Sequence, residues 1–276
     1  MYTTNVKVGR SIAVYGVRPN TGTSTLAAMT ASLLAARGER TLLLSTDSDI
    51  PYDAVSMLSD EITENHLDEL TVLENSNGLA PGRMDDYVTF LTDNLGFLRA
   101  STNMTRLTKN PARTISNIID IACYDFHYVV VDIGFAATQY ANAVIQSCDM
   151  VMHTLGQDPK SISAAADIYK HSGFGKDKLV VPIVVNFRDD VPANTDAMAK
   201  QLGVDEVFAI YHDDDVYKAG AGRKTASYVH KGVKKKGGFL GLRKKKNEDD
   251  TTAVDELGCV CDLIVGALSG DEKEGN

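Results

Sequence analysis

Short, uninterrupted apolar runs alternate along the chain with longer stretches that have helical spacing. Such runs are typical of strands covered on both faces, because a strand with one exposed face carries polar residues at every second position. The alternation predicts right-handed crossovers, and hence an α/β fold with a doubly wound, mostly parallel sheet and helices on both faces. The predicted strands are 11–15, 41–45, 95–100, 128–132, 149–154, 179–186 and 207–210, and the clearest predicted helices are 25–37, 111–124 and 161–171.

Length and charge narrow the class of protein. The chain has 276 residues, 43% of them hydrophobic, which is enough to bury a sizeable core. No apolar run reaches the roughly 18 residues that a transmembrane helix needs. Eight of the 28 basic residues and no acidic one lie in 231–246, so the rest of the chain has 20 basic against 37 acidic residues. An acidic body with one basic patch argues against a general nucleic-acid coat protein.

The polar N-terminus lacks the apolar stretch of a secretory signal, which predicts a cytoplasmic protein. In that compartment Cys123, Cys148, Cys259 and Cys261 are expected to be reduced structural thiols, and the spacing of the last two is poor for zinc. We expect one main domain over 1–230, a basic, Gly-rich mobile segment over 231–250, a helix over 251–268 that packs back on the domain, and a polar tail over 269–276.

The first predicted strand leads into a polar loop, Gly16 to Thr25, and then directly into a helix. This is the geometry of a phosphate cradle, in which backbone N–H groups and the helix N-terminus point at an anion. The Walker A pattern requires lysine where this chain has Thr23, and glycine where it has Val17. A Gly/Asn/Pro turn without a ligand is therefore the alternative.

The order of this loop and the later segments resembles the ParA/MinD family of deviant-Walker P-loop ATPases. The family loop reads Lys-Gly-Gly-x-Gly-Lys-Thr-Thr, and residues 18–25, Arg-Pro-Asn-Thr-Gly-Thr-Ser-Thr, align with it. Asp47 aligns with the second aspartate of the family's next strand, Asp132 with a strand-ending aspartate, and Asn186 with the asparagine that contacts adenine. The resemblance covers about residues 10–228 plus the last helix and implies a P-loop NTPase-like fold.

The resemblance implies ATP or ADP with Mg²⁺ as the cofactor, or none if the altered site is dead. Asp47 and Arg18 would be catalytic, the first by orienting water or contacting Mg²⁺ and the second by contacting phosphate. Three of the aligned residues also have an alternative role that involves no ligand. The alternatives are capping for Asp132, turn chemistry for Asp47 and an ordinary loop amide for Asn186. The implied metal site is Ser24, Asp47 and Asp132, and the implied cofactor contacts are Arg18, Asn20, Thr21, Gly22, Thr23, Ser24, Thr25 and Asn186.

Departures from the family loop bear directly on catalysis. The family lysine neutralises phosphate charge as it grows in the transition state, whereas Thr23 carries no charge. A neutral hydroxyl does not replace a charge-assisted hydrogen bond, which is stronger by about 1 kcal/mol or more. Pro19 also removes a backbone donor from the loop. We therefore expect hydrolysis to be weak or absent.

The basic segment over 231–246 has two basic clusters around a short apolar centre. Such a pattern favours an anionic membrane surface, since each Lys or Arg contributes about 1 kcal/mol there and apolar side chains insert shallowly. A solvated loop or protein contact, and DNA phosphates, are the alternatives. The residues assigned to this contact are Lys234, Lys235, Lys236, Phe239, Leu240, Leu242, Arg243, Lys244, Lys245 and Lys246.

Three functions follow from the resemblance and these departures. The first is a positioning or scaffold protein with a degenerate nucleotide site, a homodimer that recruits a pilus, secretion, conjugation or division assembly to the inner face of a membrane. Its loop resembles those of the TadZ/CpaE branch. The second is an active, ATP-switched dimerising ATPase. The third is a DNA-partitioning protein that binds DNA without sequence preference.

Overall fold

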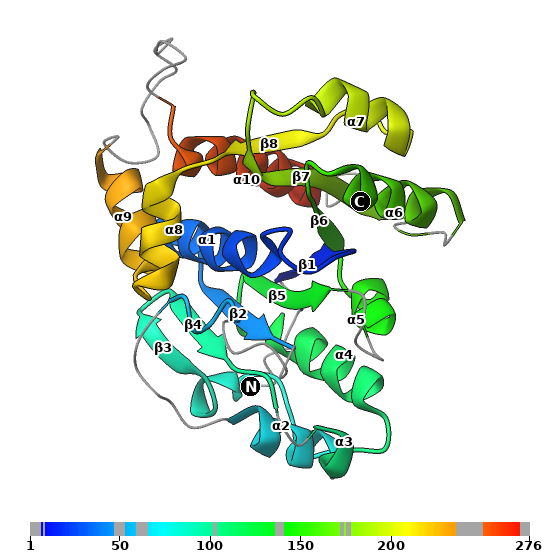
Figure 1. Cartoon of the computed structure of the whole chain (residues 1–276). Coiled ribbons are helices and arrows are strands. Elements are labelled where there is room, and N and C mark those ends of the chain that lie inside the picture. Colours follow the sequence, from blue (N-terminus) through cyan, green and yellow to red (C-terminus); the bar gives the residue numbers. More distant parts are fainter. Residues whose placement is uncertain are drawn as a thin grey trace.

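A single eight-stranded sheet organises the chain. The computed structural model describes residues 7, 9–46, 53–58, 66–101, 104–135, 141–171, 174, 178–235 and 251–270. The strand order is β3-β4-β2-β5-β1-β6-β7-β8, with all neighbours parallel except the antiparallel pair β3–β4. The predicted doubly wound sheet is confirmed (Figure 1). The strands are β1 (Arg10–Gly16), β2 (Thr41–Ser45), β3 (Thr89–Thr92), β4 (Leu95–Leu98), β5 (Tyr128–Phe135), β6 (Met150–Leu155), β7 (Leu179–Phe187) and β8 (Phe208–Tyr211).

Helices cover both faces of the sheet. One face packs against α1, α8, α9 and α10, and the other against α2, α4 and α5 near its middle and α6 and α7 towards β7. The helices are α1 (Thr23–Ala36), α2 (His66–Asn75), α3 (Met104–Leu107), α4 (Pro111–Ala122), α5 (Ala141–Ser147), α6 (Pro159–His171), α7 (Thr195–Leu202), α8 (Asp214–Ala221), α9 (Thr225–Lys235) and α10 (Ala253–Gly270), with a 3₁₀ helix at Met84–Asp86.

Strand β1 shows why the apolar runs are continuous. Ile12 and Val14 belong to the core under α1, whereas Ala13 and Tyr15 belong to the core under α4. All four are almost fully buried. Because successive side chains of a strand point to opposite faces, a central strand needs apolar residues at every position.

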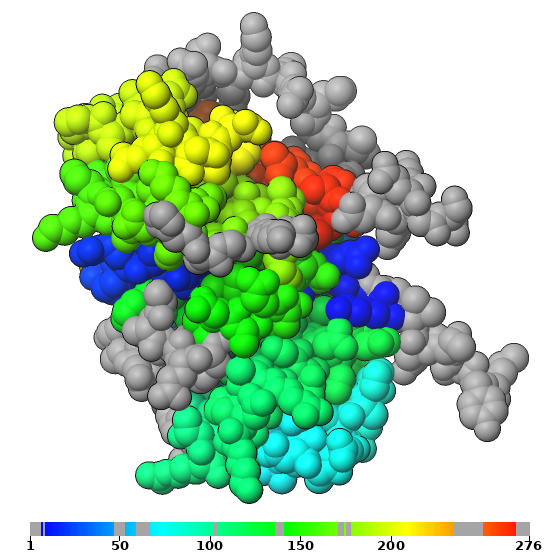
Figure 2. Space-filling model, turned by 90° about the vertical axis from the view of Figure 1, so that its right-hand side faces the viewer, coloured from blue at the N-terminus to red at the C-terminus, as the bar shows by residue number. Residues whose placement is uncertain are grey.

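The last helix, α10, packs against α1, α9 and β8. Arg37 at the end of α1 forms an ion pair with Asp262 at 2.9 Å, and its guanidinium also donates to the Gly258 carbonyl. The Glu256 carboxylate accepts the Tyr211 N–H at 2.8 Å. Figure 2 shows α10, in red, next to a yellow part of the chain.

Two regions of the chain differ from the sequence prediction. The stretch between the second and third predicted strands contains α2 and the edge strand β3. β3 is a four-residue strand with partly exposed side chains, so it has no apolar run to mark it. Residues 231–235, expected to begin a mobile basic segment, form the end of α9.

Helices long and apolar enough to cross a bilayer do not occur among the described residues.

Candidate functional site

The loop between β1 and α1 lies at the carboxyl end of the central strand. Its backbone adopts left-handed conformations at Asn20 (φ 63°) and Gly22 (φ 85°). A Cβ at Gly22 would lie 2.7 Å from the Cβ of Val185, so only glycine fits where the loop passes β7. Gly22 is also the N-cap of α1, which places the positive end of the helix dipole at the loop. These features suit the binding of an anion.

Three buried threonine hydroxyls meet beneath the loop. The Thr23 hydroxyl lies 2.8 Å from that of Thr154 on β6, and the Thr21 hydroxyl lies 3.0 Å from Thr154 and 3.3 Å from Thr23. The Thr21 hydroxyl also donates to the Arg18 carbonyl, and the Thr154 hydroxyl donates to the Tyr15 carbonyl. The residue at the lysine position therefore directs its hydroxyl into the protein.

Gly16, the last residue of β1, makes room for this threonine cluster, Thr21, Thr23 and Thr154. A Cβ at Gly16 would lie 2.4 Å from the Thr21 hydroxyl oxygen and 2.7 Å from each of the other two. Any other residue at position 16 would push the cluster apart. The loop is thus attached to β6 through the hydroxyl of Thr154.

Asp132, on β5 next to β1, is buried beside the start of α1. Its carboxylate accepts N–H groups from Ala54 at 3.1 Å and Gly134 at 3.2 Å, and a hydrogen bond from the Ser24 side chain. Burial raises the pKa of Asp132 to about 6, although the hydrogen bonds from Ser24 and Ala54 act in the opposite direction. Capping of the strand end and a place in a metal site are both compatible with these contacts.

The residues around Asp132 fit a hydrated Mg²⁺ ion. Ser24 and Asp132 supply a hydroxyl and a carboxylate, the oxygen ligands that Mg²⁺ prefers. The buried Ser45 hydroxyl, on β2 beside Asp132, has no hydrogen-bond partner in the described part of the chain. Asp47, the third predicted ligand and a predicted catalytic residue, lies outside the described residues.

A cavity of about 430 Å³ lies beside the loop. It brings together Thr25 and Asn186, two residues that the sequence assigned to the cofactor from distant segments. Asn186 is exposed and has φ 64°, a left-handed conformation uncommon for residues other than glycine. The volume is within the range of about 300–1,000 Å³ typical of ligand sites. The lining is completed by Met57, Val216, Tyr217, Gly220 and Ala221.

The remaining predicted contact residues are Arg18 and Asn20 in the loop and those assigned to a membrane or polyanion contact. Arg18 is half-buried in the loop, and Asn20 is exposed at its tip. Lys234 is exposed on α9, and Lys235 ends that helix. The other residues assigned to a membrane or polyanion contact, Lys236, Phe239, Leu240, Leu242, Arg243, Lys244, Lys245 and Lys246, lie outside the described residues.

Sequence reasoning missed Thr154 and Tyr217. Thr154 reads as the end of an apolar strand, and only the pairing of β6 with β1 brings it beneath the loop. Tyr217 follows an acidic stretch and reads as one residue of a surface helix. No sequence motif over 213–217 indicates that a residue there binds a ligand.

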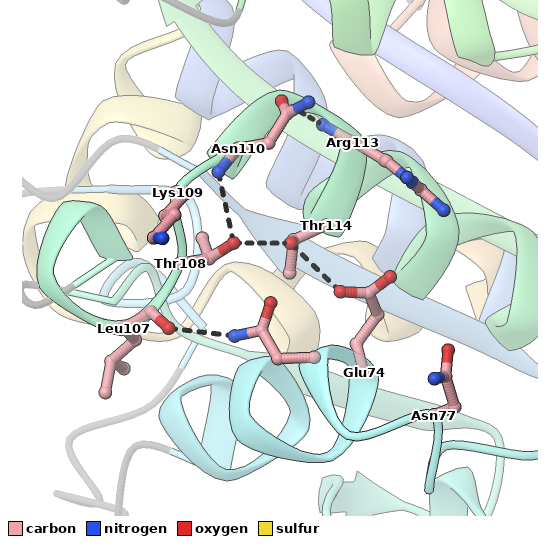
Figure 3. Close-up of a pocket in the computed structure, with 9 residues that line it drawn as sticks. Glu74, Asn77, Leu107, Thr108, Lys109, Asn110, Arg113 and Thr114 are labelled. Carbon is pink, nitrogen blue, oxygen red and sulfur yellow. Dashed lines mark hydrogen bonds between the residues drawn. The ribbon is translucent and has the colours of Figure 1, made fainter.

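A second cavity, of about 450 Å³, lies between α2 and the start of α4 (Figure 3). Its polar wall includes Glu74, whose carboxylate accepts the Thr114 hydroxyl at 3.0 Å and the Asn117 amide at 2.6 Å. Lys109 and Arg113 also line it. No predicted site residue is among its lining residues.

The mostly parallel sheet, with a loop between β1 and α1 at the carboxyl end of β1, matches the P-loop NTPase fold of solved structures. Among solved structures, a ParA family ATPase from Chlorobium tepidum TLS gives a TM-score of 0.71 at 18% identity, covering 91% of this chain and 98% of that one. The septum site-determining protein MinD from Pyrococcus horikoshii OT3, complexed with Mg-ADP, gives 0.67 at 15% identity, covering 94% and 98%. A plasmid partition protein from Borrelia burgdorferi B31, bound to AMPPNP, gives 0.62 at 11% identity, covering 94% and 99%. The chain has the ParA/MinD fold.

No protein-family model and no curated protein sequence matches the chain.

Proposed function

We propose that this chain is a ParA/MinD-like positioning or scaffold protein with a degenerate nucleotide site. The observation that carries the proposal is the threonine cluster within this fold: the residue at the lysine position is neutral and its hydroxyl is engaged by Thr154. The fold of septum-determining and plasmid-partition proteins supports a role in positioning. Without the lysine charge, the site supplies little stabilisation to a phosphoryl-transfer transition state.

The site keeps the parts needed to bind a nucleotide. Backbone N–H groups of the loop would hold phosphate, with Arg18 the one charged side chain between Gly16 and Thr25. Ser24 and Asp132 would hold Mg²⁺, which supplies charge neutralisation at the phosphates when it is bound. Asn186 and Thr25 would contact the nucleoside from the cavity.

The basic segment would recruit the protein to an anionic membrane surface. Support comes from the sequence pattern of two basic clusters around Phe239, Leu240 and Leu242. The partner there would be a pilus, secretion, conjugation or division assembly, and the scaffold would act as a homodimer. An active ATPase and a DNA-partitioning protein remain competing functions, and each predicts a different measurement.

The first test measures nucleotide binding, assembly state and turnover on the same preparation. Calorimetric titration with Mg·ATP and Mg·ADP, sedimentation with each nucleotide, and phosphate release are the readouts. A scaffold is expected to release phosphate no faster than its Asp132→Asn variant and to have the same assembly state with ATP and with ADP. Robust turnover with an ATP-specific dimer would instead identify an active ATPase.

The second test separates membrane from DNA. The full chain is sedimented with vesicles of anionic lipid, with neutral vesicles and with duplex DNA, at low and high salt. We expect binding to anionic vesicles alone, weakened by salt. A control variant in which the eight basic residues of 231–246 are changed to glutamine should lose it. Preferential binding to the duplex would favour the DNA-partitioning function.

A further inference from the structure

A third cavity, of about 660 Å³, lies at the carboxyl end of α1. It is bordered by the last turns of α1, by α9 and by the turn between β3 and β4. Helix α9 and strand β4 both contact α1 (Figure 1). Because α1 has 14 residues, it is about 20 Å long, so this cavity is separate from the phosphate loop at the other end of the helix. Its volume suits a small organic molecule.

The inner part of this cavity is apolar. Ala35, Leu58 and Leu95 line it and are buried. Ala226 lines it from α9, which packs against α1. Short side chains where two helices meet leave a space that longer side chains would fill. A ligand there would place carbon atoms against this apolar surface.

Arg223 borders the cavity in a backbone conformation that is unfavourable for arginine. Its φ is 53°, in the left-handed region, directly after α8. Its N–H donates to the Gly220 carbonyl, and the N–H of Lys224 donates to the Ala219 carbonyl, which are the two hydrogen bonds of a Schellman motif. Glycine usually takes this position because it has no Cβ. An arginine kept there at the edge of a cavity points to a function of its side chain.

The polar groups around this cavity are of two kinds. Arg223 contributes a guanidinium, and Ser227 and His230, three residues apart on the same side of α9, contribute a hydroxyl and an imidazole. Guanidinium groups bind phosphate oxygens through two parallel N–H bonds. The turn between β3 and β4 contributes Asp93 and Asn94, whose side-chain oxygens accept hydrogen bonds from hydroxyl groups.

We propose that this cavity binds a small phosphate ester that carries hydroxyl groups. The phosphate contacts Arg223, Ser227 and His230, and the carbon skeleton packs on the apolar inner surface. The hydroxyl groups donate to Asp93 and Asn94. Two sources share this chemistry, a free sugar or polyol phosphate and the glycerophosphate headgroup of a lipid. The inference does not depend on the nucleotide site proposed above.

Calorimetric titration of the full chain with glycerol 3-phosphate, glucose 6-phosphate, inorganic phosphate and glycerol tests the proposal. We expect each ester to bind about fivefold or more tightly than inorganic phosphate, because its hydroxyl groups add hydrogen bonds. Glycerol, which lacks the phosphate, should not bind at millimolar concentration. Equal affinity for the esters and for inorganic phosphate would overturn the inference.

Arg223→Gly separates binding from folding. It removes the guanidinium, and glycine adopts a φ of 53° without strain, so the melting temperature should not fall. Binding of either ester should weaken about tenfold or more. Arg83→Gln, which removes an exposed arginine outside the cavity, is the matched control and should retain binding. Ester binding by Arg223→Gly at the wild-type affinity would overturn the inference.

Asp93→Ala tests the contact with the hydroxyl groups. Binding of glucose 6-phosphate should weaken about threefold or more, because an acceptor is lost. Binding of inorganic phosphate should stay equal or become tighter, because a negative charge is removed from the cavity. An ester bound only at the phosphate loop would respond neither to this variant nor to Arg223→Gly, and that result would contradict the proposal.

Vesicles identify the source of the ester. Wild type, Arg223→Gly and Arg83→Gln are sedimented with phosphatidylglycerol vesicles, with and without glycerol 3-phosphate. Weaker binding by Arg223→Gly alone, together with competition by the soluble ester, would assign the cavity to a lipid headgroup. Equal vesicle binding by all three proteins, with soluble esters still bound by the wild type, would assign it to a free metabolite. If vesicle binding is equal and the soluble esters do not bind at millimolar concentration, the inference is wrong.

Discussion

Thr23 shows which properties of a site residue follow from the sequence and which depend on the fold. The sequence shows that the lysine of the phosphate loop is replaced by a neutral residue, which already argues against fast hydrolysis. The direction of its hydroxyl depends on β6, which lies 131 residues further along the chain at Thr154. Local spacing carries no information about that contact, so the threonine cluster could not have been predicted.

Replacing Thr154 with valine tests the cluster. Valine has nearly the same shape, but it removes the bonds to Thr21 and Thr23 and leaves their buried hydroxyls short of partners. We expect the free energy of unfolding to fall by about 1–3 kcal/mol. Urea denaturation measures it, and Thr154→Ser should restore most of the loss. Equal midpoints for wild type and Thr154→Val would show that the cluster contributes nothing to stability.

His153, next to Thr154, makes stability depend on acid. It is buried between Tyr15 and Tyr169, its Nδ1 lies 3.1 Å from the Tyr169 hydroxyl, and its Nε2 has no partner in the described residues. Burial lowers the pKa of His153 to about 3. As the pH falls below the unfolded-state pKa of about 6.5, the imidazole of His153 binds a proton in the unfolded chain but not in the folded chain.

Because of His153, the free energy of unfolding should therefore fall as the pH drops from about 6.5 towards 3. The decrease should be at most about 1.4 kcal/mol per pH unit. His153→Phe keeps an aromatic ring in the stack and should lose less stability over the same range. Urea titrations at several pH values for both proteins give the difference. Identical pH profiles would mean that the imidazole is protonated in the folded protein.

At the scale of elements, helix α10 offers a prediction with an internal control. Leu257 is fully buried against α1 and the sheet, whereas Leu263 on the same helix is 40% exposed. Leu257→Ala should lower the free energy of unfolding by about 2–5 kcal/mol. Leu263→Ala should change it by about 0.5 kcal/mol or less. Similar losses in the two variants would contradict the observed packing of α10.

Strands differ in how clearly their local sequence predicts them. The parallel strands were predicted because burial on both faces demands apolar runs, as in 128–132 of β5. The edge strand β3 has no such demand, so its short Thr-Phe-Leu-Thr sequence did not stand out. The bulge at Asn186 depends on the register of β7 against β8, which no local pattern specifies. The resemblance thus assigned Thr25 and Asn186 to one cofactor site, whereas no local pattern indicated Tyr217 or the irregularity of β7 at Asn186.

At the scale of the whole molecule, the thiols report whether the chain unfolds as one unit. Cys123, Cys148 and Cys261 are buried in the two main layers of core, and burial raises the pKa of each to about 12. Cys259 is exposed on α10. A thiolate is the reactive form, so three of the four thiols should be protected while the fold is intact.

A thiol reagent such as dithionitrobenzoate should therefore modify one cysteine of the native protein quickly and the other three only at the rate of unfolding. The expected fast amplitude is one thiol per chain, because Cys259 alone is exposed. The Cys259→Ser variant should have no fast phase. Two fast thiols in the wild type would show that one layer opens independently of the other.

The threonine cluster also bears on whether this chain could act as a switch. A ligand shifts a conformational equilibrium only to the extent that it binds one state more tightly than the other. Because the Thr154 hydroxyl on β6 is bonded to Thr21 and Thr23, it restrains the loop, and we expect nucleotide binding to change the shape of the loop little. If the chain has the positioning role proposed above, the amount of protein in the cell, rather than a nucleotide cycle, would set how long a position stays occupied.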